Sequence, residues 1–98
     1  MKFNWDSAKA ENNFRKYGVS FDDAVGVFKD PLALIFDDVE HSQKEKREIV
    51  IGMSKTCKML LMCVVVRLED SVRFISARPA KHSEARDYDE NAEITYEK

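Results

Sequence analysis

The chain contains 98 residues, of which 44% are hydrophobic and 35% charged, and its formal net charge is −2. This length allows one globular domain with a modest core and excludes two domains. The composition is that of an ordinary globular protein, which excludes disorder over most of the chain.

The small net charge conceals an uneven distribution. Residues 1–43 carry five basic and eight acidic side chains, residues 44–86 carry ten and five, and residues 87–98 carry one and five. The positive excess therefore falls on the segment that contains most of the predicted strands. This segment either forms a solvated basic face or attracts a nucleic acid, because the local field at a binding face matters more than total charge.

Two helices are predicted near the N-terminus. The first begins at a cap provided by Asp6 or Ser7 and ends at Gly18, because glycine readily adopts the positive φ of a helix C-terminus. The second begins after Ser20, whose hydroxyl group suits an N-cap, and ends before Pro31.

A sheet is predicted from short apolar segments separated by polar turns. Residues 59–66 are apolar throughout, which is typical of a central strand covered on both faces. The spacing favours an α+β fold with the two helices packed on a mainly antiparallel sheet of four to five strands. The expected strands are residues 3–5, 32–36, 47–53, 59–66 and 72–77.

The C-terminal region is predicted to contain one short helix followed by a tail. Pro79 begins a polar segment whose residues 80–88 have helical character. Residues 89–98 are acidic and lack a clear apolar period. The domain is therefore expected to span residues 1–88, with residues 89–98 as an acidic tail.

The location of the protein is predicted from its apolar runs and its cysteines. The N-terminus lacks the apolar core of a secretion signal, and the longest apolar run has eight residues, too few to cross a membrane. Cys57 and Cys63 fall in one predicted strand, about 20 Å apart at about 3.3 Å per residue, so they are not expected to pair. Two reduced thiols fit a cytoplasmic protein.

Three arginines stand at the ends of two neighbouring predicted strands. Arg67 ends the apolar run, Arg73 opens the next strand, and Arg78 stands where that strand gives way to the polar segment. A guanidinium group is permanently charged and can bind phosphate through two hydrogen bonds. The arrangement therefore suggests a phosphate site.

The sequence gives little support for a glycine-rich phosphate-binding loop or for a metal site. The three glycines are not spaced as a phosphate-binding loop, and the two cysteines and two histidines do not form a close pair with zinc-ligand spacing. Asp37 and Asp38 are interpreted as a loop carboxylate pair rather than as ligands of a divalent cation, because adjacent strand residues point to opposite faces. No metal ion or cofactor is therefore expected.

The sequence resembles the BrnT family of toxins in four ordered blocks. The blocks are Phe3-x-Trp5-Asp6-x-x-Lys9-Ala10-x-x-Asn13, Lys16-Tyr17-Gly18-Val19-Ser20-Phe21-x-x-Ala24, Val27-Phe28-x-Asp30-Pro31 and Phe74-Ile75-Ser76-Ala77-Arg78-x-Ala80. The resemblance implies a small ribonuclease of a type II toxin-antitoxin module with a fold similar to RelE. It also implies a BrnA-like antitoxin as partner, oligomers of the toxin-antitoxin complex, contact with operator DNA only through the antitoxin, and no membrane association.

The resemblance also implies roles for individual residues. Lys16 matches a basic position of the family, Glu45 and Arg47 its Glu-x-Arg pair, Gly52 the glycine that follows, and Arg78 its Ser-Ala-Arg arginine. Two positions depart from the pattern. Tyr17 stands where a histidine is usual, and Cys57-Lys58 replaces Gly-Arg.

A metal-independent ribonuclease must take a proton from the 2′-hydroxyl group, stabilise the phosphorane charge and protonate the leaving 5′-oxygen. Glu45 is the candidate proton acceptor, and Arg47 and Arg78 are the candidate charge stabilisers. Lys16 and Lys58 are assigned to flanking phosphates, or one of them to the leaving group. The remaining candidates for RNA binding are Arg67, Arg73 and His82.

Structural interpretations compete with these catalytic roles. Glu45 can pair with Arg47 or Lys58 on an exposed face, and Lys16 can complement the dipole at the end of its helix. Arg78 can pair with a carboxylate of a neighbouring helix, such as Asp22 or Asp23.

The remaining candidates also have structural alternatives. Arg67 and Arg73 can be solvated strand-end charges, and His82 an exposed helix histidine, while His41 in the polar turn has a weaker claim to catalysis. Core packing is preferred to base stacking for the aromatic residues Trp5, Phe21 and Phe28. At the level of function, the alternative to a toxin enzyme is a non-catalytic binding subunit of an operator-bound repressor complex.

Overall fold

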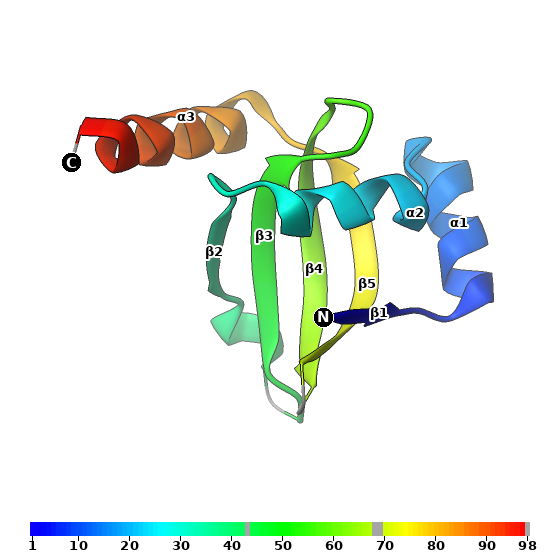
Figure 1. Ribbon diagram of the computed structural model, residues 1–98. Helices are drawn as coiled ribbons and strands as arrows, with labels where there is room; N and C mark the ends of the chain where they lie inside the picture. The colour runs from blue at the N-terminus through cyan, green and yellow to red at the C-terminus, as the bar shows by residue number, and fades with distance from the viewer. Residues whose placement is uncertain (43, 68–69, 98) are drawn as a thin grey trace.

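The described part of the chain folds into an α+β domain, as predicted, with one five-stranded sheet and three α-helices (Figure 1). The computed structural model describes residues 1–42, 44–67 and 70–97, with side chains at all of these except 67 and 93–97. The helical elements are α1 (Ser7–Tyr17), α2 (Phe21–Ala24), η1 (Val25–Lys29), η2 (Val39–His41) and α3 (His82–Glu97), where η denotes a 3₁₀ helix. The strands are β1 (Lys2–Asn4), β2 (Leu34–Asp37), β3 (Arg47–Met53), β4 (Met59–Arg67) and β5 (Ser71–Pro79).

The sheet is mixed, whereas the sequence predicted mainly antiparallel pairing. Its strand order is β1-β5-β4-β3-β2, and β1 lies parallel to β5 while the other three pairings are antiparallel. The N-terminal segment is fixed there by the Lys2 amide, which donates to the Asp70 carbonyl at 2.8 Å. A strand of three residues carries no sequence signal for the direction of its pairing, so only the folded chain could reveal it.

The first helix begins and ends where the sequence predicts. The Asp6 carboxylate accepts hydrogen bonds from the amides of Ala8 and Lys9. At the other end Gly18 adopts a φ of 70° and its amide donates to the Phe14 carbonyl. Both ends are therefore capped by local chemistry.

The second predicted helix is shorter than expected and continues as a 3₁₀ helix. Ser20 caps α2 through the Asp23 amide, but α2 ends at Ala24 and η1 follows directly. Gly26 explains the close packing of this segment on the β3–β4 hairpin, since a Cβ atom there would lie 2.4 Å from the Lys55 amide nitrogen. The segment from α2 to η1 crosses one face of the sheet (Figure 1).

The core lies between this segment and the sheet, with Phe74 at its centre. The Phe74 side chain is fully buried, and its ring centroid lies 5.3 to 5.7 Å from four other aromatic rings. Those rings belong to Phe3, Trp5, Phe21 and Phe28. The structural interpretation of Trp5, Phe21 and Phe28 is therefore confirmed, because their rings pack in or against the core.

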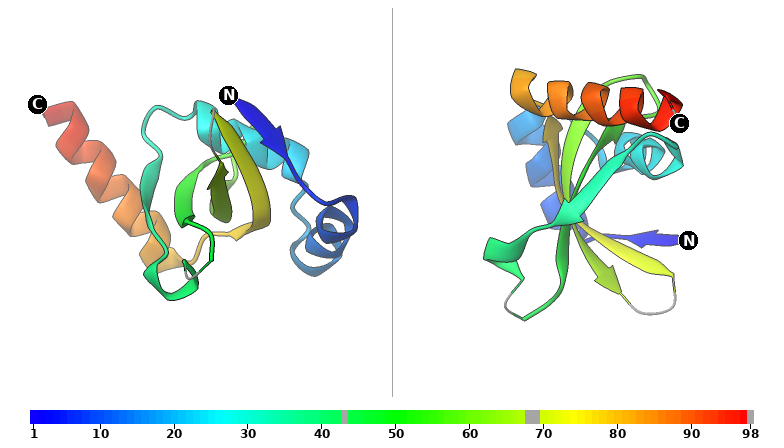
Figure 2. Two further views of the ribbon diagram at one scale, coloured as in Figure 1. Left: turned by 90° about the horizontal axis from the view of Figure 1, so that it is seen from below. Right: turned by 90° about the vertical axis from the view of Figure 1, so that its left-hand side faces the viewer.

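Helix α1 covers the edge of β5 beyond the short strand β1 (Figures 1 and 2). Asn13 of α1 is buried, and its carboxamide accepts from the Ala77 amide at 3.0 Å and donates to the Ala77 carbonyl at 2.8 Å. The side chain thus satisfies the two main-chain groups that a neighbouring strand would otherwise bond. This contact fixes α1 against the half of β5 that β1 does not reach.

Helix α3 is longer than predicted. The sequence suggested a short helix at residues 80–88, but α3 continues to Glu97 and therefore crosses the expected boundary at residue 88. It contacts β2 and β3, and the Tyr88 hydroxyl group donates to Asp30 Oδ2 at 2.8 Å. Within the described ranges, no helix is long and apolar enough to cross a membrane.

Candidate active site

The face of the sheet opposite α2 presents three of the predicted arginines. In the strand register Val65 pairs with Arg47 on one side and with Arg73 on the other. Paired residues of adjacent strands project to the same face, so the two arginines lie about 10 Å apart, two strand spacings, on either side of a buried valine. We call the face carrying Arg47, Arg73 and Arg78 the arginine face.

Arg78 reaches this face because β5 is irregular. Val64 pairs with Phe74 but Cys63 pairs with Ser76, which leaves Ile75 as an extra residue on β5. With regular alternation Arg73 and Arg78 would point to opposite faces, and the extra residue reverses the alternation. Arg78 pairs with Leu61, four residues along β4 from Val65, and so lies about 13 Å along the strand from Arg73.

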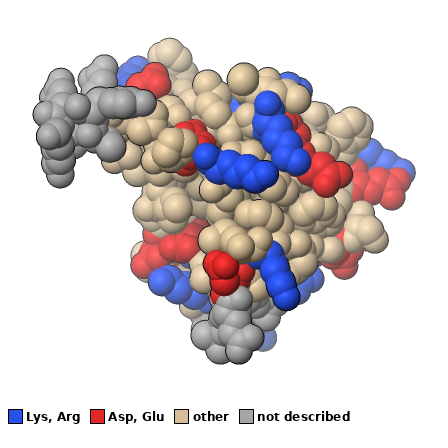
Figure 3. All heavy atoms as spheres, in the orientation of Figure 1, with Lys and Arg blue, Asp and Glu red and all other residues tan. Residues whose placement is uncertain are grey.

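The face of the sheet that α2 and η1 cover carries charges of both signs. Among the described residues visible over α2 and η1, basic and acidic side chains are interspersed (Figure 3). The strand register places Arg47, Arg73 and Arg78 on the arginine face instead.

The predicted pair Glu45 and Arg47 lines a pocket of about 340 Å³ at one end of the arginine face. We call it the His41 pocket, and its lining residues are Glu40, His41, Lys44, Glu45 and Arg47. It combines two cations with groups able to accept a proton. The sequence assigned His41 only a weak claim, yet the fold brings its ring into the same pocket as the Glu-x-Arg pair.

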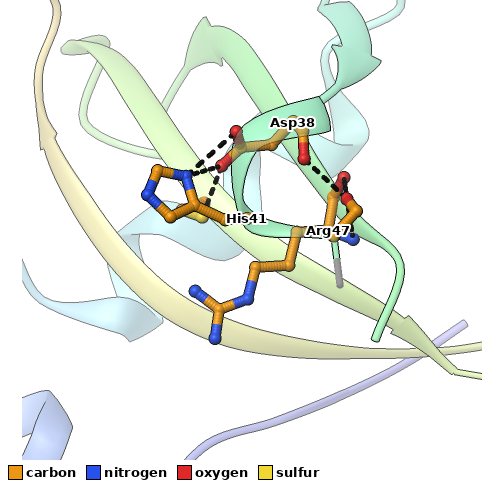
Figure 4. A network of polar contacts seen from close by, with 5 residues as sticks. Asp38, His41 and Arg47 are labelled. Atoms are coloured by element: carbon orange, nitrogen blue, oxygen red, sulfur yellow. Dashed lines mark hydrogen bonds and ion pairs between the residues drawn. The ribbon is translucent and has the colours of Figure 1, made fainter. Parts of the chain in front are cut away.

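His41 is held by Asp38, which belongs to the predicted loop carboxylate pair Asp37-Asp38. The Nδ1 atom of His41 lies 2.9 Å and 3.1 Å from the two carboxylate oxygens of Asp38. The Asp38 side chain is only 12% exposed, whereas that of His41 is 60% exposed. Figure 4 shows the His41 ring and the Arg47 guanidinium group projecting to the same side of the turn. A spacing of three residues in a short turn was the one sequence signal for this pair.

Cys63 lies beneath this turn in the centre of β4. Burial and the nearby Asp38 carboxylate raise the pKa of its thiol, with a smaller opposing effect from Arg47, so the thiol is protonated at neutral pH. Its Sγ atom lies 3.9 Å from Asp38 Oδ2 and acts as a donor. Cys57, by contrast, is exposed and lies in the β3–β4 turn with a φ of 62°, not in the strand as predicted, and both cysteines are free.

Lys16 lines a second depression, of about 300 Å³, between α1 and β5. We call it the Lys16 pocket, and its lining residues are Lys9, Asn12, Asn13, Lys16, Tyr17, Ile75 and Ser76. The Lys16 Nζ atom lies 5.2 Å from the centre of the Tyr17 ring. Ser76, which lines this pocket, pairs with Cys63 of β4, and Cys63 contacts Asp38. Cys63 and Ser76 therefore lie between the Lys16 pocket and the His41 pocket.

Arg78 already has a carboxylate partner. Its two terminal nitrogens each lie 2.8 Å from an oxygen of Glu84, at the start of α3. The structural alternative for Arg78, a pair with a carboxylate of a neighbouring helix, is what the structure contains, although the partner is Glu84 rather than Asp22 or Asp23. The hydrogen bonds from Arg78, together with one from the Lys81 amide, lower the pKa of Glu84 against the opposing effect of burial.

Replacing Glu84 with glutamine is expected to weaken the pH dependence of stability in acid. The pKa of Glu84 in the folded protein lies below the reference value of 4.5, so its contribution is present above that pH and is lost as pH falls through the folded pKa. The difference in free energy of unfolding between the parent and Glu84→Gln should therefore shrink between about pH 7 and about pH 3, measured by urea denaturation. Glu11→Gln, at an exposed ion pair, is the control and should show a smaller change.

The remaining predicted residues lie apart from the His41 pocket. Lys58 stands in the β3–β4 hairpin at the opposite end of β3 from Arg47, about 20 Å away by strand geometry. Pairing of Lys58 with Glu45 is therefore excluded. His82 is the exposed first residue of α3, and Arg67 pairs with Ser71 near Arg73, although its side chain lies outside the described residues.

A metal centre is not evident within the described part of the chain. Across the described residues, no group of three or more His, Cys, Asp or Glu side chains is arranged to hold a metal ion. The site is better described by its two cations, its imidazole and its carboxylates.

Comparisons with known proteins agree with this fold. The 1.1 Å crystal structure of the Brucella abortus ribonuclease toxin BrnT matches with a TM-score of 0.65 and 24% sequence identity, covering 84% of this chain and 99% of that one. At this level of identity the similarity establishes the fold alone. No curated protein sequence matches the chain.

The family is established by a separate comparison. The family model described as "Ribonuclease toxin, BrnT, of type II toxin-antitoxin system" matches residues 5–84. The chain therefore belongs to the BrnT family of ribonuclease toxins. Membership of a type II toxin-antitoxin family implies an antitoxin partner.

Proposed function

We propose that this BrnT-family protein is a metal-independent endoribonuclease that cleaves RNA by attack of the 2′-hydroxyl group on the adjacent phosphorus. Cleavage of messenger RNA in the cytoplasm would inhibit translation until a BrnA-like antitoxin neutralises the toxin. Through that antitoxin alone the complex would contact operator DNA, as an oligomer. The proposal includes a fold related to that of RelE-like toxins, which the sequence resemblance supports.

The observation that supports the proposal most is the composition of the His41 pocket. Arg47 can stabilise the negative charge that develops on phosphorus, and Arg73 flanks Val65 from the other side of the same face. Glu45 and His41 are both able to accept the 2′-hydroxyl proton. These groups supply two of the requirements of the transesterification step, a proton acceptor and stabilisation of the phosphorane charge.

The Lys16 pocket supports a path for flanking nucleotides. It opens beside β5, and Arg47 lies on β3, two strand spacings of about 4.8 Å away. Cys63 and Ser76 lie between the two. Lys16 can hold a phosphate, and Tyr17 offers an aromatic ring on which a base can stack. A shallow surface with Arg47, Lys16 and the Tyr17 ring suits single-stranded RNA, whose phosphates and unpaired bases are both accessible.

Purified protein is expected to cleave unstructured RNA in the presence of EDTA and to leave 2′,3′-cyclic phosphate ends. The same RNA with a 2′-deoxy residue at each cleaved position should resist, because the internal nucleophile is missing. Mass spectrometry of the fragments measures both results. A requirement for magnesium, or cleavage of the deoxy-substituted RNA, would contradict the mechanism.

A second candidate function is a non-catalytic antitoxin-binding subunit of a repressor complex. The specific observation in its favour is that Arg78 is held by Glu84 through two hydrogen bonds, which leaves it less available for a substrate phosphate. The departures at Tyr17 and Cys57-Lys58 point the same way. Expression in cells without antitoxin separates the two functions, since an active toxin arrests growth and a binding subunit does not.

A further inference from the structure

Three groups that line the His41 pocket, Glu40, His41 and Glu45, can accept a proton, and the ring of His41 is oriented by a neighbouring carboxylate. The Nδ1 atom of His41 lies 2.9 Å from the nearer Asp38 oxygen, while the ring itself is largely exposed. If Nδ1 donates to this carboxylate, Nε2 of the neutral ring is left as an acceptor facing the pocket. A carboxylate that orients an imidazole in this way also stabilises the imidazolium ion formed after proton transfer.

Asp38 is itself held in place on three sides. Its amide donates to the Arg47 carbonyl at 2.9 Å, its carbonyl accepts from the Ser42 hydroxyl group at 2.6 Å, and its carboxylate accepts from the Cys63 thiol. The Ser42 oxygen also accepts from the Arg47 amide at 3.1 Å. These bonds tie the turn to β3 and β4, so the position of His41 relative to Arg47 is defined by the sheet.

We propose that His41 accepts the 2′-hydroxyl proton and that Asp38 is its positioning residue, an inference that rests on the proposed ribonuclease function. Glu45 then contributes to the charge balance of the pocket rather than to proton transfer. The charged groups that face His41 are Asp38, Glu40, Lys44, Glu45 and Arg47. Arg47 supplies the positive charge that draws the scissile phosphate toward the ring.

The reaction requires no reagent other than water. The 2′-oxygen loses its proton to Nε2 of His41 and forms a bond to phosphorus, and the bond from phosphorus to the 5′-oxygen breaks. The 5′-oxygen takes a proton from water, and the imidazolium ion returns its proton to the hydroxide so formed. The products are a 2′,3′-cyclic phosphate and a 5′-hydroxyl end.

The test compares the pH profiles of kcat/KM for the parent, His41→Asn, Asp38→Asn and Glu45→Gln on a short labelled RNA. Activity of the parent should fall as the pH is lowered, because a protonated ring cannot accept the proton, and we call this fall the acid limb of the profile. His41→Asn should remove the acid limb and lower the rate by about 100- to 10,000-fold.

Asp38→Asn should lose less, about 10- to 100-fold, by analogy with other groups that orient a reacting histidine. Glu45→Gln should keep the acid limb of the profile. Asp22→Asn, on the exposed part of α2, is the matched control for the loss of one carboxylate and should behave as the parent. Equal thermal unfolding of all variants is checked first.

A second readout does not depend on catalysis. Long-range ¹H–¹⁵N spectra report which ring nitrogen of His41 carries the proton, and the parent should show the Nδ1-protonated form at a pH where the ring is neutral. Asp38→Asn should shift the ring toward the Nε2-protonated form.

The possible failures are distinguishable. If the parent does not cleave RNA, the proposed function is wrong and this inference is wrong with it. If the parent cleaves and His41→Asn cleaves equally well, only the inference fails. If Glu45→Gln, and not His41→Asn, removes the acid limb, Glu45 is the proton acceptor and the inference is overturned.

Discussion

Replacing Arg47 with alanine is expected to lower the rate of RNA cleavage by about 100- to 1,000-fold, the usual cost of removing one preorganised group that stabilises transition-state charge. The reason is its position, since Arg47 lines the His41 pocket and adjoins the turn that carries the Asp38–His41 pair. The loss should appear mainly in kcat, because the charge that Arg47 meets grows as the phosphorane forms. Single-turnover cleavage of a labelled RNA measures it.

Two further variants make this prediction specific. Arg47→Lys keeps the charge but loses the planar fork, so it should recover part of the rate. Arg15→Ala removes an exposed arginine of α1 that pairs with Glu11, and it should leave cleavage unchanged. If Arg47→Ala cleaves as fast as the parent, the His41 pocket is not the active site.

Replacing Phe74 with alanine is expected to lower the free energy of unfolding by about 3–5 kcal/mol. A domain of this kind has a total stability of about 5–15 kcal/mol, so much of the population would unfold at moderate temperature. The cost is high because the Phe74 side chain is fully buried and contacts four other aromatic rings. Urea denaturation followed by Trp5 fluorescence measures the change.

Two control variants separate the effect of the buried position of Phe74 from that of losing any phenylalanine. Phe14→Ala removes a phenylalanine that is 57% exposed on α1, and it should cost less than about 1 kcal/mol. Phe74→Leu keeps most of the volume and should cost less than Phe74→Ala. Equal losses for Phe14→Ala and Phe74→Ala would contradict the central place of Phe74 in the core.

Much of the fold follows from local chemistry that is legible in the sequence. Asp6, Gly18 and Ser20 mark helix ends because capping depends on one side chain and a few neighbouring amides. The apolar run of β4 identifies the central strand because burial on both faces requires it. The Glu-x-Arg spacing brings Glu45 and Arg47 to one pocket because they are two residues apart.

Other features depend on contacts between distant segments. The parallel pairing of β1 and the length of α3 could not be inferred, because a three-residue strand and an acidic segment carry no strong periodic signal. The pairing of Arg78 with Glu84 is another case, since many carboxylates stand near it in sequence and only the fold selects one.

By itself the sequence determined the α+β class, the capped first helix, the positive central segment and the BrnT family. These rest on local capping, burial patterns, charge counts and short motifs, all of which act over a few residues. The tertiary structure alone decided which groups share the active-site face. One extra residue in β5 turns Arg78 to the side of Arg73, and a turn tied to β3 brings His41 and its partner Asp38 beside Arg47. Strand register and loop placement are set by packing over the whole domain, so no short stretch of sequence contains them.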